Sequence, residues 1–208
     1  ETRIQELLGI KAILDNYRDI VLQVRVGATD FSSYFGARRG IDYTIYDIHT
    51  VRDILTDILN IFGRNNDYVI SGPVWEYFRA SVDMKFRELP KHDIQSSIIK
   101  RKSIVNDEVD GLLREVILDK ANGFVGRTII HPTHIKYVNG MQAVTREEYE
   151  DACQILNTQD GVIKSINANK MNEVRPHLSW AKKVYYRAKA FGVIEDASSY
   201  IELFGVED

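Results

Sequence analysis

Three apolar, β-branched runs separated by helical stretches constrain the fold of this chain most. The runs cover 19–27, 67–73 and 127–132, and they end on Gly, Gly-Pro and His-Pro, respectively. Between them, apolar residues recur at helical spacing over 51–62, and 106–123 carries helix start and stop signals. Strands that alternate with helices along a chain are typical of a parallel sheet of the α/β class. Three evident strands are fewer than the eight that a closed (β/α)8 barrel requires.

The rest of the chain divides into a leading helix, an irregular excursion and a helical tail. Apolar residues over 3–17 fall largely on one helical stripe, whereas about 79–106 is polar and has no clear period. In the tail, a Thr and a Glu three residues later have the spacing of a capping box before an apolar helix. We therefore expect a sheet-bearing unit over residues 1–144 and a helical C-terminal extension over 145–208.

Composition argues against several classes of function. The chain has 208 residues, of which 44% are hydrophobic, and a formal net charge of −3, so no basic face indicates nucleic-acid binding. It has no run of about 18 apolar residues that would cross a membrane, and we expect a cytoplasmic protein. Its single cysteine, Cys153, excludes an internal disulfide and a Cys-based zinc site. Cys153 lies in an amphipathic helical pattern, where we expect a buried structural thiol.

Each apolar run ends on, or is soon followed by, residues that are mostly small or polar. Ligands of α/β folds bind beyond the carboxyl ends of the strands, so these residues are the candidate site. In chain order they are Gly27, Ala28, Thr29, Asp30, Ser71, Gly72, Pro73, Trp75, Glu76, His131, Pro132 and His134. Each has a plainer interpretation as well. Strand-Gly-x-x-Asp is also common as a turn with a helix cap, the Trp-Glu pair also fits packing, and the two histidines lack a third metal ligand.

Two carboxylates in this set suggest a metal site. Glu1 precedes the first helix and would itself follow a strand, so it would converge with Asp30 at one edge of the sheet. Facing carboxylates repel each other unless a cation lies between them. A hard divalent ion with oxygen ligands, most naturally Mg²⁺, satisfies both.

Neighbouring residues suggest an anionic substrate. Gly27 and Ala28 lack bulk, so their backbone N–H groups could approach a substrate carboxylate closely. Arg38 and Arg39 could add a fork for a carboxylate or phosphate, although an arginine pair is also common on a solvated surface. Glu76 is a further catalytic candidate.

Several motifs together resemble the citrate lyase β-subunit / HpcH-HpaI aldolase superfamily. They are Glu-Thr at 1–2, "GATDFS" at 27–32 and "GFVGRTIIHPTHIKYVN" at 123–139. Three more segments, "YFGARRG", "TIYDI" and "ISGPVWEYF", look more like the divergent C–C bond lyase branch encoded beside tellurium-resistance genes.

The resemblance implies a (β/α)8 TIM barrel and a metal-dependent carbon–carbon lyase. Glu1 and Asp30 match the residues that hold Mg²⁺ in this superfamily, a site that Mn²⁺ could also occupy. The 27–30 turn would bind the substrate carboxylate, and Pro132 lies in the matching Ile-His-Pro motif. The implied reaction cleaves or forms a bond next to the carbonyl of a 2-oxo or 3-hydroxy acid.

In that alignment, the three apolar runs are barrel strands six to eight. The chain would then hold the C-terminal half of a barrel, from the end of strand five, plus the tail. Half a barrel exposes two sheet edges and a large apolar face. We therefore expect that residues upstream supply the remaining strands, or that another copy of the chain covers the exposed apolar face.

The tail departs from the superfamily pattern. Acyl-CoA members carry Asp-Gly-Lys-Met, whereas this chain has Ala168 and Asn169 before Lys170 and Met171. The sequence therefore leaves open whether the substrate is a coenzyme A thioester. The resemblance also implies self-association as a homo-oligomer. A second interpretation remains: a non-catalytic binding or scaffold barrel in a stress-resistance (tellurium) system.

Overall fold

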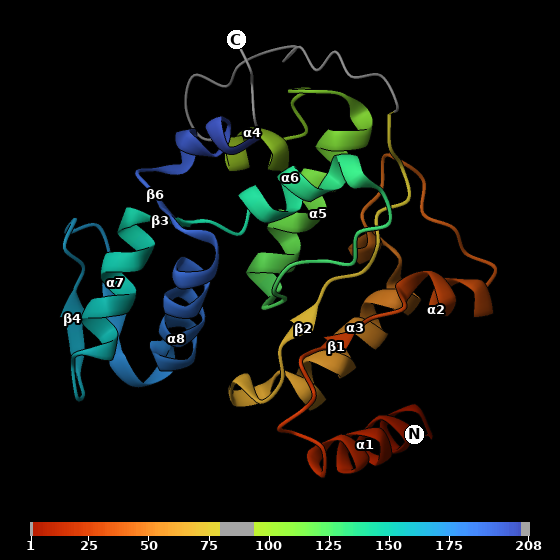
Figure 1. The fold of residues 1–208 in the computed structure, drawn as a ribbon, viewed down its shortest axis with the longest axis horizontal. Coiled ribbons are helices and arrows are strands. Elements are labelled where there is room, and N and C mark those ends of the chain that lie inside the picture. The colour runs from red at the N-terminus through yellow and green to blue at the C-terminus, as the bar shows by residue number, and fades with distance from the viewer. Residues whose placement is uncertain (1, 80–93, 205–208) are drawn as a thin grey trace.

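The computed structural model describes residues 2–79 and 94–204, which form a helix-rich α/β structure (Figure 1). Short 3-10 turns join the main elements. In chain order these are α1 (Thr2–Asp15), β1 (Val24–Arg25), α2 (Ala28–Tyr34), α3 (His49–Phe62), β2 (Ile70–Ser71), α4 (Ile94–Ile99), α5 (Asp107–Asn122), α6 (Ile135–Gly140), β3 (Val144–Thr145), α7 (Arg146–Leu156), β4 (Val162–Lys164), β5 (Met171–Glu173), α8 (Val174–Phe191) and β6 (Val193–Ile194). Glu1 and residues 80–93 of the expected excursion lie outside the described residues, and α4 shows that the excursion is partly helical.

The three apolar runs lie side by side in parallel. β1 pairs with β2, with Val24 opposite Ile70. On the other side of β2, Gly72 forms a parallel bridge with Arg127, and the Thr128 N–H donates to the Gly72 carbonyl at 2.9 Å. The predicted α/β class is therefore confirmed. Regular pairing is two residues long between β1 and β2, and the third run, 127–132, pairs through a single bridge and forms no regular strand. The described residues form no closed barrel.

Two helices cover this small sheet with separate apolar clusters. The predicted stripe of α3 packs with Val26, Ile70 and Phe124 from the strand region. α5 packs with Trp75 and with residues of α6. The ends of α5 are as its sequence predicts: the Asn106 side chain accepts a hydrogen bond from the Val109 N–H at 3.0 Å, and Gly123 follows the helix with a φ of 95°.

The tail has a third cluster, in which α7 packs against α8 beside β3. The capping box at the start of α7 is confirmed, because the Glu148 carboxylate accepts the Thr145 N–H at 3.1 Å and the Thr145 hydroxyl accepts the Glu148 N–H at 3.3 Å. The tail also contains the antiparallel hairpin β4–β5, which helical spacing does not signal. Cys153 on α7 is half-buried rather than buried.

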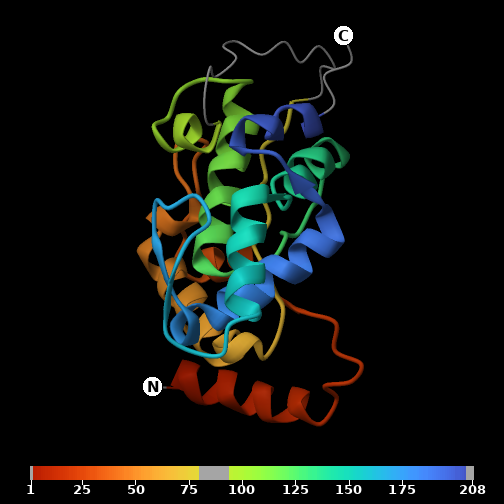
Figure 2. The same cartoon turned by 90° about the vertical axis from the view of Figure 1, so that its left-hand side faces the viewer.

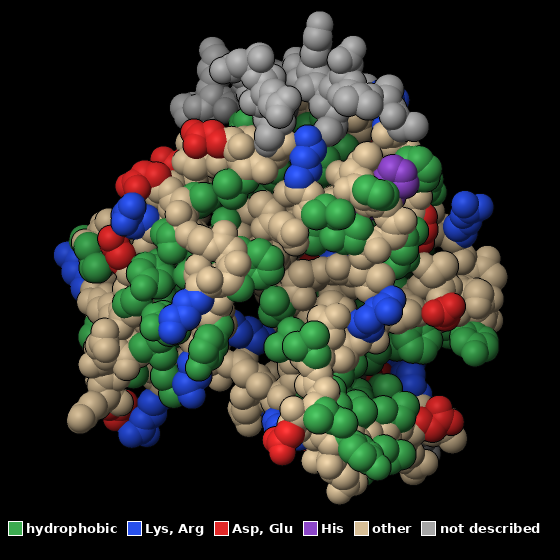
Figure 3. All heavy atoms as spheres, in the orientation of Figure 1, with side chains coloured by type: hydrophobic (Ala, Val, Ile, Leu, Met, Phe, Trp, Pro, Cys, Tyr) green, Lys and Arg blue, Asp and Glu red, His purple; other side chains and the backbone are tan. Residues whose placement is uncertain are grey.

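Helix α1 lies at one end of the molecule and packs on one side only (Figure 2). Leu7 and Leu14 contact the α3 cluster, but the other apolar residues of its stripe are largely exposed. Ile20 and Leu22, in the connection to β1, are 80% and 85% exposed. Apolar side chains gather on this end of the surface (Figure 3). None of the helices in the described ranges is long and apolar enough to cross a membrane.

One glycine sets how closely α5 approaches the Trp75 ring. A Cβ atom at Gly111 would lie 2.4 Å from two carbons of that fully buried ring. We predict that Gly111→Ala lowers the free energy of unfolding by about 1–3 kcal/mol, because the core must shift to accept the methyl group. Urea unfolding measures this change.

Gly9→Ala is the matched control, because Gly9 lies on exposed helix α1 with no atom within 4 Å of its would-be Cβ. It should stabilise the chain by up to about 1 kcal/mol through helix propensity. Equal stability of Gly111→Ala and the wild type would contradict the packing described above.

Candidate active site

The carboxyl ends of the three parallel runs form one edge of the sheet, which we call the rim. It comprises residues 27–30, 71–76 and 128–132. A hydrogen bond of 3.1 Å from the Thr29 hydroxyl to the Glu76 carboxylate joins the first two segments. Arg25 of β1, just before the first segment, donates to the Thr128 hydroxyl of the third segment at 3.3 Å. The sheet therefore brings together the strand-end residues that the sequence singles out.

Asp30 lies in the first turn of α2 with its side chain exposed. Within residues 2–79 and 94–204, its carboxylate forms no ion pair or hydrogen bond. Glu1, its predicted partner, lies outside those residues. In the described part of the chain, no three His, Cys, Asp or Glu side chains gather as a metal cluster. A metal bound here would therefore take Asp30 together with ligands from outside that part, from solvent or from substrate.

The two adjacent arginines have different environments. Arg38 is exposed, whereas Arg39 is 4% exposed and lies beneath the rim. Arg39 pairs with Glu76 and with Glu115 of α5, and donates to the Val74 carbonyl at 2.9 Å. Its guanidinium also lies 4.8 Å from the centre of the Trp75 ring. Arg39 thus connects the rim to α5, and its side chain is engaged by protein groups.

Glu115 is the centre of a buried charge network. It is fully buried, and its two oxygens bind two arginines, Arg39 on one side and Arg127 at 2.5 Å on the other. The Ile45 N–H donates to the same carboxylate at 2.6 Å. Arg127 continues the network through its Nε atom, which lies 2.6 Å from the Pro73 carbonyl and 3.1 Å from the Asp119 carboxylate.

Asp119 ends this network one helical turn beyond Glu115. The Tyr46 hydroxyl donates to it at 2.6 Å. Burial raises the pKa of Asp119 to about 7, against the opposing effect of Arg127. Burial and the Asp119 charge also raise the pKa of Tyr46, so this hydroxyl stays protonated.

His131, in the third segment, and His134, just after it, are both engaged by protein groups. Phe78 stacks on the His131 ring at 3.8 Å between centres, and the His131 Nδ1 lies 2.8 Å from the Thr133 hydroxyl. His134 is buried, its Nε2 donates to the Tyr77 carbonyl at 3.1 Å, and burial lowers its pKa. The pair therefore organises the rim. Pro132, between them, is exposed.

The acidic members of the buried network are not among the residues that the strand-end pattern singles out. Glu115 and Asp119 are four residues apart, so they share one face of α5, and that face is buried. The available signal was this pair of acids within an otherwise apolar segment, with an arginine at the start of the next strand.

The model of the family described as C-C_Bond_Lyase of the TIM-Barrel fold matches residues 1–193. The chain belongs to this family of C–C bond lyases. No curated protein and no solved structure matches it. The family match bears out a TIM-barrel lyase, while the narrower relation to citrate lyase β-subunits stays a prediction. TIM-barrel active sites lie at the carboxyl ends of the strands, so the rim is the candidate site of this lyase.

Removing the charge of Glu115 should strongly lower the stability of the lyase. Glu115→Gln leaves two buried arginines facing a neutral amide, so we predict a loss of about 3–5 kcal/mol in the free energy of unfolding. The exposed Glu6→Gln on α1 should be neutral. A change of less than about 1 kcal/mol in Glu115→Gln, which is the range of a surface pair, would contradict a central role for Glu115.

The raised pKa of Asp119 should make the free energy of unfolding depend on pH. The pKa of Asp119 is higher in the folded state than in the unfolded state, so between these two values the folded state holds a proton that the unfolded state has lost. Protonation of Asp119 therefore stabilises the fold fully only below the unfolded pKa. As pH rises from about 4 to about 7, wild type should lose stability relative to Asp119→Asn. Urea unfolding at several pH values measures this difference. Parallel curves for the two proteins would contradict the raised pKa.

Proposed function

We propose that this lyase is Mg²⁺-dependent and acts next to the carbonyl of a 2-oxo or 3-hydroxy acid, with the reaction at the rim. Asp30 carries the proposal. Its carboxylate is exposed at the carboxyl end of β1, and within the described residues no cation or donor engages it. Such a carboxylate fits a hard divalent ion that keeps positions open for water and substrate.

Glu1 is the proposed second ligand, on the resemblance described above. Bound there, Mg²⁺ would polarise the substrate carbonyl and stabilise negative charge that develops on its oxygen. Mn²⁺ fits the same oxygen ligands.

The backbone that leads into α2 is the proposed carboxylate cradle. The first helical bond of α2 runs from the Phe31 N–H to the Gly27 carbonyl at 3.1 Å, so the N–H groups of Ala28, Thr29 and Asp30 precede it. Gly27 and Ala28 leave the approach to these groups unhindered by long side chains. These N–H groups would orient the acid end of the substrate beside Asp30.

The side chains around the cradle have separate proposed roles. Glu76 is 32% exposed and is held by Thr29 and Arg39, so its carboxylate is positioned at the rim as the candidate acid–base group. Arg39 acts through Glu76 as a positioning residue. Arg38 is free to meet an anionic substrate from solvent, and Pro132 would contact the substrate at the third segment.

Metal binding tests the assignment of Asp30. We predict that Asp30→Asn weakens Mn²⁺ binding by about tenfold or more, because one of few charged ligands is lost. Titration followed by electron paramagnetic resonance measures free Mn²⁺. Asp53→Asn, an exposed carboxylate on α3, is the control and should bind as wild type does. Equal affinity of wild type and Asp30→Asn would overturn the site.

Turnover separates this proposal from the scaffold interpretation. The full chain, with Mg²⁺, is assayed against 2-oxo acids, 3-hydroxy acids and their coenzyme A thioesters. Cleavage that is lost in Asp30→Asn and retained in Asp53→Asn supports a lyase with its metal at the rim. Metal binding without turnover of any of these compounds would favour a scaffold.

A further inference from the structure

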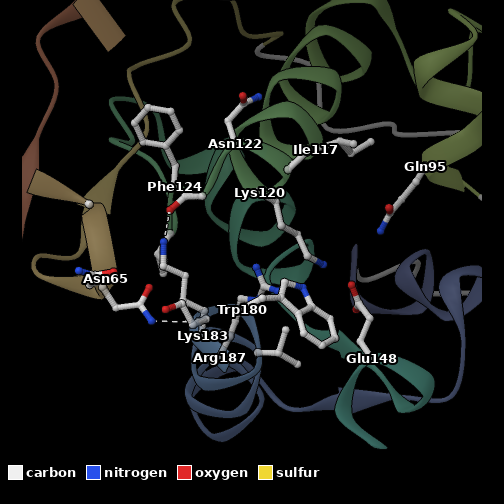
Figure 4. A pocket seen from close by; sticks show the side chains of 17 residues that line it. Asn65, Gln95, Ile117, Lys120, Asn122, Phe124, Glu148, Trp180, Lys183 and Arg187 are labelled. Atoms are coloured by element: carbon white, nitrogen blue, oxygen red, sulfur yellow. Dashed lines mark hydrogen bonds between the residues drawn. The ribbon is translucent and has the colours of Figure 1, made fainter. Parts of the chain in front are cut away.

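A cavity of about 510 Å³ lies at the edge of the sheet opposite the rim, between α5 and α8 (Figure 4). Its walls include Asn65, which precedes β2, and Phe124, which precedes the third run, so it is at the amino ends of the strands. A second cavity of about 500 Å³ shares Lys183 and Arg187 with the first. This space belongs to neither the rim nor the buried network around Glu115.

Arg187 of α8 lines both cavities and is half-buried. Within the part of the chain that the structure describes, it forms no ion pair, and its Nε atom has no hydrogen-bond partner. Burial lowers the pKa of its guanidinium. The charge of Glu148 opposes this shift, but within the described residues no carboxylate forms an ion pair with the guanidinium, and a partly buried charge without an ion-pair partner is costly. A bound anion would supply such a partner.

The charges around Arg187 are unbalanced. Lys183 donates to the Gly123 carbonyl at 2.9 Å, and burial and Arg187 lower its pKa. Lys120 lies on the α5 wall and donates to the Tyr200 hydroxyl at 2.9 Å, and burial lowers its pKa to about 8. Glu148 is the sole carboxylate among the described lining residues, and it already caps α7. Three cations thus face one anion.

Figure 4 shows Lys120, Glu148 and Arg187 directed toward one another across the gap between α5 and α8, with the Trp180 ring beside them. The Arg187 guanidinium can donate two parallel hydrogen bonds to two oxygens of one oxyanion. A dianion would also offset the excess of two positive charges among the lining residues. A phosphate monoester is close to a dianion at neutral pH. The volume leaves room for the remainder of a small molecule, with Trp180 as an apolar wall.

We propose that this cavity binds the phosphate group of a small molecule, with Arg187 and Lys183 donating to its oxygens. The site lies apart from the metal proposed at the rim and does not depend on it.

Calorimetric titration of the full chain with inorganic phosphate tests this site. Wild type should bind phosphate, and Arg187→Gln and Lys183→Met should each weaken binding about tenfold or more, the effect of losing a charge-assisted hydrogen bond. Arg175→Gln is the control, because it removes one positive charge from the same helix at a side chain that is 80% exposed. Circular dichroism checks that each variant folds. If Arg187→Gln does not fold, Lys183→Met still tests the site.

Three results would overturn the proposal: no binding at millimolar phosphate, unchanged affinity in the folded cavity variants, or an equal loss in Arg175→Gln. Succinate, a dicarboxylate, is the comparison ligand, and binding as tight as that of phosphate would contradict the phosphate assignment. Mn²⁺ binding is measured on the same variants. It should be unchanged in Arg187→Gln, which separates failure of this site from failure of the rim.

Discussion

The position of the rim depends on one buried carboxylate, Glu115, held between Arg39 and Arg127. The two arginines come from segments far apart in the sequence, and α5 contributes the acid between them. Through Arg39 the network reaches Glu76, and through Arg127 it reaches the third parallel run. A buried ion network of this kind adds little net stability, but removing one member is costly, so it fixes geometry more than it strengthens the fold.

Periodicity predicted the parts of the fold whose cause is local. The three runs, helix α3 and the caps of α5 and α7 follow from apolar spacing and from side-chain hydrogen bonds a few residues apart. The exposure of the α1 stripe does not follow, because spacing shows which residues share a face and not what covers that face. The hairpin β4–β5 likewise has no strong periodic signal in its short strands.

For the candidate site, the sequence predicted the strand-end positions but could not assign the charges within them. Arg38 and Arg39 are chemically identical neighbours, and only the path of the loop places one in solvent and the other beneath the rim. Arg127 acquires its role from acids on α5, which is a tertiary contact. The family match then identifies a C–C bond lyase of the TIM-barrel fold, and Asp30 at the rim is where we propose that a divalent metal binds.

We propose that a divalent metal binds at the rim, and nuclear magnetic resonance of the ¹⁵N-labelled chain with Mn²⁺ can locate the bound ion. Paramagnetic broadening reports which backbone amides lie close to the ion. We expect early loss of signals from 27–30, 71–76 and 128–132, while those of 63–66 and 123–125 at the opposite edge persist. Broadening centred on the opposite edge, or none at the rim, would contradict this proposal.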